Sequence, residues 1–237
     1  MKPGVAADDY VLVQGLRDTR GTLERWQRAP WPVLGRWLGL SLAIALSLLA
    51  SVLVIASIST PDETVFIPGI DSSADGGEMA RILAANALVL ALHAVACIAG
   101  FIAGSSMRLE ADRRTGFSRK LHERAGLLAI AWVGFVTLFS LVTQAYALGL
   151  IGSDIAADLA ISPVTLVLTV LPHAVPELVA LFLPLAAWLV ASRRDEWDQL
   201  LAATFVTVTI AIPVLIISAI VELTVWPALL ERASPVV

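Results

Sequence analysis

LGLSLAIALSLLASVLVIASI, residues 38–58, is a run of 21 residues that contains no charged side chain. An α-helix rises about 1.5 Å per residue, so the run is about 31 Å long, which matches the roughly 30 Å hydrocarbon core of a bilayer. It is too long for the apolar core of a signal peptide. The stretch therefore predicts a helix that crosses a membrane.

Four more apolar runs of spanning length follow along the chain, at residues 82–106, 125–151, 163–191 and 200–226. The 237 residues are 58% hydrophobic and 15% charged, whereas a soluble domain carries about 25% charged residues. The net charge of −4 is modest and favours no nucleic-acid partner. We therefore predict an all-α fold, a polytopic transmembrane helical bundle with about five spans.

Basic residues in the short loops predict how the chain is inserted, because Lys and Arg collect on the cytoplasmic side. Fourteen of the sixteen Lys and Arg residues lie in three segments that the five spans place on one side: 1–36, 107–124 and 192–199. The loops on the other side, 59–81 and 152–162, are mainly acidic. We predict that the N-terminus is inside and the C-terminus outside.

The segments outside the bundle are short. Residues 1–36 are predicted to form a cytoplasmic leader, residues 37–230 the transmembrane bundle and residues 231–237 a short outside tail. Within the leader, residues 10–28 have the spacing of an interfacial helix, and a plain polar leader is the alternative. The tryptophans near the span ends suit the aromatic belts of a bilayer: Trp26, Trp31, Trp37 and Trp226.

A few polar side chains interrupt the spans, and such groups normally face protein or water rather than lipid. They are Asn86 and His93 in the second span, Gln144 in the third, His173 and Glu177 in the fourth, and Glu222 in the fifth. At about 100° per residue, the second, fourth and fifth spans each gather their polar residues on one face. We predict that these three faces meet as one polar cluster that is reached from outside.

Pro172 and Pro176 flank His173 in the fourth span, and Pro184 follows two turns further on. Proline removes a backbone donor and frees the carbonyl four residues earlier, and within a bilayer a neighbouring helix or water must satisfy that carbonyl. We therefore predict that the fourth span is kinked or broken, and we place Pro172 and Pro176 with the polar cluster.

Small residues share the polar face of the second span. Ala96, Gly100 and Gly104 lie, with the polar pair of that span, within a sector of about 80°. Gly100 and Gly104 form a GxxxG pair, which lets another helix approach closely. We predict that these positions serve helix packing within the chain, with dimerisation as the alternative.

The predicted cluster is compatible with several kinds of chemistry. His173 and Glu177 share a face at i and i+4, which fits a hydrogen bond that only locks helices together and also fits transport or proton relay. Metal binding fits less well, because HAVPE is not the HExxH motif and no second carboxylate lies at matching depth. No nucleophile or paired carboxylate accompanies the cluster, which argues against catalysis. We predict no catalytic residues, no metal site and no cofactor.

The stretch LPHAVPELVALFLPLAAWLV, residues 171–190, resembles the stage II sporulation protein M family. Members of that family carry a Pro-His-Gly stretch, then a Glu and small apolar residues, in a late span. The matching residues in the fourth span are Pro172, His173, Glu177 and Ala180, and those in the second and last spans are Asn86, Gly100, Gly104, Glu222 and Pro227. Ala174 departs from the pattern, since the family usually has Gly there.

This resemblance implies a multi-pass protein of the bacterial cytoplasmic (inner) membrane. The namesake of the family works in engulfment in spore-forming bacteria, with partners that degrade peptidoglycan, and the family supplies no catalytic residues. The first hypothesis is therefore a non-enzymatic scaffold or assembly factor that contacts membrane lipid and other membrane or cell-envelope proteins, with a homo-oligomer as one alternative. A channel or transporter with an outward-facing polar cavity is the second hypothesis, and an intramembrane hydrolase is the third.

Overall fold

The computed structural model describes residues 11–62, 75–106 and 117–236, which hold helices and, within these ranges, no strand. The elements in chain order are α1 (Val11–Arg28), α2 (Trp31–Ile58), α3 (Gly76–Phe101), the π-helical turn η2 (Ile102–Ser106), α5 (Phe117–Asp158), α6 (Pro163–Arg194), the 3-10 turn η3 (Trp197–Gln199) and α7 (Leu200–Ala233). The all-α fold is therefore confirmed.

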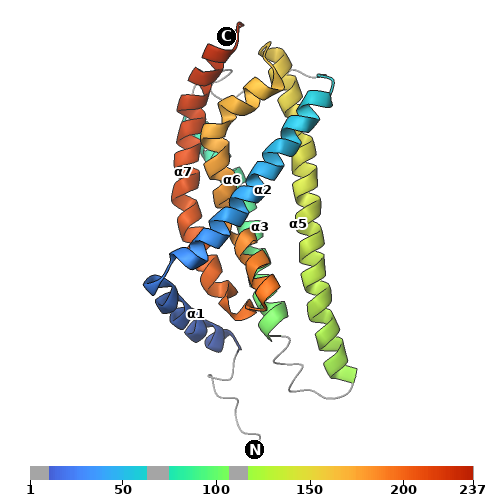
Figure 1. Ribbon diagram of the computed structural model, residues 1–237, viewed down its shortest axis with the longest axis vertical. Helices are drawn as coiled ribbons and strands as arrows, with labels where there is room; N and C mark the ends of the chain where they lie inside the picture. Colours follow the sequence, from blue (N-terminus) through green and yellow to red (C-terminus); the bar gives the residue numbers. More distant parts are fainter. Residues whose placement is uncertain (1–10, 63–74, 107–116, 237) are drawn as a thin grey trace, which may run out of the picture.

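Five of these helices, α2, α3, α5, α6 and α7, are long and apolar enough to cross a membrane, which confirms the predicted number of spans. They run along the long axis of the molecule, with α1 at one end and the end of α7 at the other (Figure 1). In their most apolar windows, 56% of the residues of α6 are buried, against 11% of those of α5. The core of the bundle is thus built around α6, and α5 lies at its edge.

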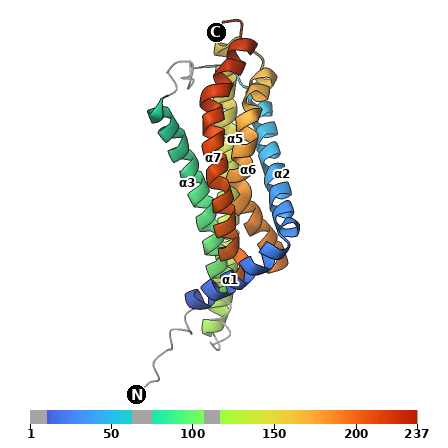
Figure 2. The ribbon, with the colours of Figure 1, turned by 90° about the vertical axis from the view of Figure 1, so that its left-hand side faces the viewer.

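The helix α1 lies across one end of the bundle, where it packs against α7 and η3 (Figure 2). Trp26 of α1 meets Trp37 of α2 edge to face, with ring centroids 5.1 Å apart. Trp37 is only 4% exposed, whereas Trp31 is 74% exposed. Of these tryptophans, Trp31 keeps the position expected for an aromatic belt, while Trp37 belongs to the core. The predicted helix at residues 10–28 is present as α1, and its place in a lipid interface stays a prediction.

Each of the five spanning helices extends beyond its predicted span. The second span was expected to begin at residue 82, but α3 begins at Gly76, because Asp75 Oδ1 accepts hydrogen bonds from the backbone N–H groups of Gly77 and Glu78 at 2.8 and 2.9 Å. Such a side-chain cap satisfies the free donors of a helix start. The helix α5 continues through most of the predicted loop 152–162, and α7 continues to Ala233 rather than ending at residue 226.

The fourth span is one continuous helix, α6, that contains all three prolines and changes direction along its length (Figure 1). The alternative of two separate halves is therefore wrong, and the kinked form is right. Side chains from neighbouring helices donate to its carbonyls: Ser41 Oγ to Val179 O at 2.6 Å, and Cys97 Sγ to Pro184 O at 3.0 Å. These donors hold α2 and α3 against the part of α6 on either side of Pro184.

Replacing Ser41 by Ala should lower the stability of the bundle by about 1 kcal/mol, because a hydrogen bond between two membrane helices is lost. Ser51→Ala is the matched control, since the Ser51 hydroxyl is exposed and bonds only to Ser47 O of its own helix. Thermal unfolding in detergent would measure both variants. An equal loss of thermal stability in the two variants would contradict the role of the Ser41 hydrogen bond in holding α2 against α6.

Gly100 and Gly104 lie against tryptophan side chains of the same chain rather than against a helix backbone. A Cβ added at Gly100 would lie 2.6 Å from Trp188 Nε1, and one at Gly104 would overlap the ring of Trp197. Trp188 and Trp197 are each 5% exposed and lie on α6 and η3. The two glycines therefore leave room for large side chains from the end of α6 and the turn that follows it.

Candidate functional site: an acidic cavity in the bundle

A cavity of about 240 Å³ lies between α2, α5, α6 and α7. Along α6 its wall runs from Pro163, the first residue of the helix, to Leu178. At about 1.5 Å per residue this is roughly 22 Å, most of the thickness of a bilayer core. The cavity thus starts at the end of the bundle that is predicted to be outside and reaches past the middle of the spans.

Four side chains make the polar part of this wall: His173 and Glu177 from α6, and Glu222 and Trp226 from α7. His173 is 7% exposed, and its ring packs against Trp226 with the centroids 5.5 Å apart. The spacing of four residues on each helix puts both members of each pair on one face, and the extensive packing of α6 on α7 brings the two faces together.

Glu177 and Glu222 lie close enough to interact electrostatically, and Asn86 of α3 lies beside Glu177. Glu222 in turn interacts with Arg81 and Glu78, which pair with each other at 2.8 Å in the first turns of α3. A series of polar groups therefore leads from the exposed Arg81 to the half-buried Glu177. This series joins α3, α6 and α7.

Glu222 lines the same cavity as Glu177, so a second carboxylate shares this wall with it. Because α7 continues past residue 226, Glu222 lies roughly 16 Å along the helix from its end at Ala233. Asn86 likewise lies further from the start of α3, because that helix begins at Gly76. That no second carboxylate lies at the depth of Glu177 in a bilayer stays a prediction.

Several buried polar atoms around the cavity have no hydrogen-bond partner among the described residues. They are Asn86 Nδ2, His173 Nδ1, Glu177 Oε2, Ser218 Oγ and Trp226 Nε1. Leaving such an atom buried and unpaired costs about 1–3 kcal/mol, so native proteins usually supply a partner, often an ordered water. The arrangement suits a site that holds water or an ion better than a dry lock between helices.

His93 lies apart from this cavity. Its Nδ1 is 2.9 Å from Leu181 O, and its ring packs on Phe182 with the centroids 5.6 Å apart. Together with Ala96 and Gln144 it lines a second cavity of about 230 Å³ between α3 and α5. The polar residues that were predicted to form one cluster therefore lie at two places. Asn86, His173, Glu177 and Glu222 lie at or beside the acidic cavity, whereas His93 lies at the cavity between α3 and α5.

Pro172 and Pro176 are exposed on the outer side of α6, so their rings do not line the cavity. Pro184 is fully buried. The three prolines therefore act on the site through the course of the α6 backbone rather than through side-chain contact.

Sequence reasoning missed one residue of the site, Trp226. Trp226 was predicted to lie in an aromatic belt, but it is 6% exposed and packs on His173. Its position four residues after Glu222 was the available signal, since i and i+4 share a face. Ser218, 1% exposed, lies four residues before Glu222 on the same face.

Within the described ranges, no group of three or more His, Cys, Asp or Glu side chains is placed to hold a metal ion. The acidic cavity offers two carboxylates and one imidazole that faces Trp226.

The family model of stage II sporulation protein M (SpoIIM) matches residues 124–227, which include most of α5, all of α6 and most of α7. No curated protein and no solved structure matches the chain. The matched part includes His173, Glu177, Glu222 and Trp226 of the acidic cavity. The chain is therefore a multi-pass membrane protein that is similar, over residues 124–227, to the stage II sporulation protein M family, as its sequence predicted.

Proposed function

We propose that this protein is a channel or transporter that takes up a small cation, H⁺ or Na⁺, through an outward-facing cavity, with Glu177 and Glu222 as the binding pair. The observation that carries the proposal is that two carboxylates from different helices, Glu177 of α6 and Glu222 of α7, line the same cavity. Two such groups in a medium of low dielectric constant cannot both be ionised without a compensating positive charge.

The surroundings of the pair support the uptake of a positive charge. Glu177 Oε2 is buried and has no hydrogen-bond partner among the described residues, so this oxygen can accept a proton or contact a cation. Arg81, the basic residue that interacts with Glu222, is 59% exposed and is already paired with Glu78. Ionisable groups in membrane spans generally mark ion or substrate pathways, and here they follow one another from the start of α3 to the middle of α6.

Cysteine labelling tests whether water reaches the cavity. Val170→Cys, on the cavity wall, should react with a membrane-impermeant maleimide added from outside. Leu168→Cys, at almost the same depth but 60% exposed on the outer face of the bundle, should stay unreactive, because a thiol in lipid does not ionise. The only native cysteine, Cys97, is fully buried and gives a low background. An unreactive Val170→Cys protein, or equal labelling of the two variants, would contradict the proposal.

A scaffold for cell-envelope proteins is the second candidate, and the length of α5 favours it. The helix has 42 residues, more than a straight span needs, and it reaches beyond the other spans at the end near α1 (Figure 1). The sequence of residues 117–124 is rich in charge, so we propose this end of α5 as a docking element for a partner protein. A measurement of H⁺ and Na⁺ flux through the bundle separates the two candidates, because a scaffold does not need to conduct ions.

A further inference from the structure

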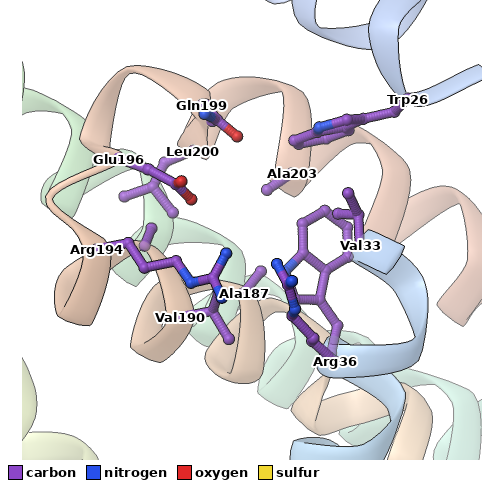
Figure 3. Close-up of a pocket in the computed structure, with 12 residues that line it drawn as sticks. Trp26, Val33, Arg36, Ala187, Val190, Arg194, Glu196, Gln199, Leu200 and Ala203 are labelled. Carbon is purple, nitrogen blue, oxygen red and sulfur yellow. The ribbon is translucent and has the colours of Figure 1, made fainter. Parts of the chain in front are cut away.

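A third cavity lies at the end of the bundle opposite to the mouth of the acidic cavity. It has a volume of about 230 Å³ and lies among α1, α2, α6, η3 and α7 (Figure 3). Trp26, Trp37 and Val190 form apolar walls, and Ala203 closes one side. Because it lies where α2 and α7 begin and α6 ends, it is at the level of the lipid headgroups if these helices span a bilayer.

Two arginines reach over this cavity from opposite sides. Arg36 comes from α2 and Arg194 from the last turn of α6, and their guanidinium groups both extend toward the space between them (Figure 3). Both residues are exposed, and among the described residues neither has an ion-pair partner. Arginine presents a planar set of donors that matches the oxygen atoms of a phosphate.

We propose that this cavity binds an anionic phospholipid, whose phosphate lies between Arg36 and Arg194 and whose glycerol and first methylene groups pack on the tryptophan walls. Basic pockets between helices at the cytoplasmic surface bind the headgroups of anionic lipids, and the distribution of Lys and Arg predicts that this end is cytoplasmic. The site is separate from the acidic cavity, with which it shares no residue.

Glu196 sets the preference among headgroups. It lies on the same rim as Arg194 (Figure 3), so the three charged side chains give the cavity a net charge of about +1. A headgroup with one negative charge, such as phosphatidylglycerol, balances that charge. Removing the charge of Glu196 should therefore strengthen the binding of phosphatidylglycerol, whereas it would weaken the binding of a headgroup that carries an ammonium group.

The experiment uses the full chain purified in detergent and measures the thermal shift and the lipid adducts in native mass spectrometry as a short-chain phosphatidylglycerol is added. Arg36→Gln and Arg194→Gln should each weaken binding about fivefold, the loss expected for one basic residue at an anionic lipid. Arg193→Gln is the matched control, because it removes the same charge from the neighbouring exposed position, which does not line the cavity. Glu196→Gln should tighten binding.

Three outcomes would overturn the proposal. Arg193→Gln could weaken binding as much as Arg194→Gln does, which would mean a diffuse surface charge rather than a site. Phosphatidylcholine or phosphatidylethanolamine could bind as well as phosphatidylglycerol, or Glu196→Gln could weaken binding. Glycerol 3-phosphate could stabilise the protein as well as the lipid does, which would identify a soluble phosphate compound as the occupant. The arginines are exposed, so the variants should fold, and circular dichroism checks this.

Discussion

Replacing Glu177 by Gln is expected to reduce cation flux at least tenfold while the protein still folds and inserts. The loss corresponds to the removal of one charged ligand, since a contact to a charged group contributes about 1.5–3 kcal/mol. The same change removes one of two neighbouring carboxylates from the interior of the bundle, so the thermal stability should stay equal or rise. Flux into liposomes, measured separately for H⁺ and Na⁺ with fluorescent dyes, and unfolding in detergent would give both results.

Glu231→Gln is the matched control for this experiment, because Glu231 is exposed on α7 and does not line the cavity. Its flux should equal that of the unmodified protein. Two results would count against the proposed transport: an absence of H⁺ and Na⁺ flux in the unmodified protein, or a Glu177→Gln variant that misfolds or loses a partner protein. The second result is the one expected of a scaffold held together by the cluster.

Replacing Gly104 by Ala should lower the free energy of unfolding by about 1–3 kcal/mol, although Ala is normally the better helix former. The added Cβ would overlap the ring of Trp197, which is 5% exposed and fixed by a hydrogen bond from its Nε1 to Asp195 Oδ1 at 2.7 Å. Neither the ring nor the π-helical turn that carries Gly104 can move without disturbing the connection between α6 and α7. Thermal or SDS-induced unfolding would measure the loss.

Gly39→Ala provides the control, because a Cβ at Gly39 meets no atom within 4 Å. Its stability should be unchanged or slightly higher. A double variant that combines Gly104→Ala with Trp197→Leu should recover part of the loss, since the two positions are in contact and their effects are then not additive. If Gly104→Ala were as stable as Gly39→Ala, the proposed packing of Trp197 against η2 would be wrong.

The number and order of the spans could be predicted from the sequence, because an uncharged apolar run of about 20 residues has the length of a membrane-spanning helix and is uncommon in soluble folds. The faces of the helices were also predictable, since the angular position of a residue depends only on its spacing along the helix. The tryptophan neighbours of Gly100 and Gly104 could not be predicted, because Trp188 and Trp197 lie more than 80 residues further along the chain.

The depth of polar residues was the main quantity that the sequence did not supply. A hydropathy pattern indicates the end of a span where polar residues begin, but a helix continues wherever its backbone N–H and C=O groups remain hydrogen-bonded. The side chain of Asp75 caps such an extension of α3, and α7 continues beyond Pro227. The separation of His93 from Glu177 has a related cause. Their side chains share the interior of the bundle, but His93 is bonded to Leu181 O, one turn further along α6 than Glu177.

The depth of the acidic cavity also places its carboxylates within the electric field of a living membrane. An elementary charge that crosses the whole bilayer at 100 mV gains about 2.3 kcal/mol. The wall of the cavity follows α6 from Pro163 to Leu178. With the Pro163 end outside, as the basic residues predict, a cation that reaches Glu177 passes more than half of the core, which corresponds to ~1 kcal/mol or more at that voltage. A cell with a negative interior would therefore draw cations toward Glu177 and fill the site several times more readily than a depolarised one.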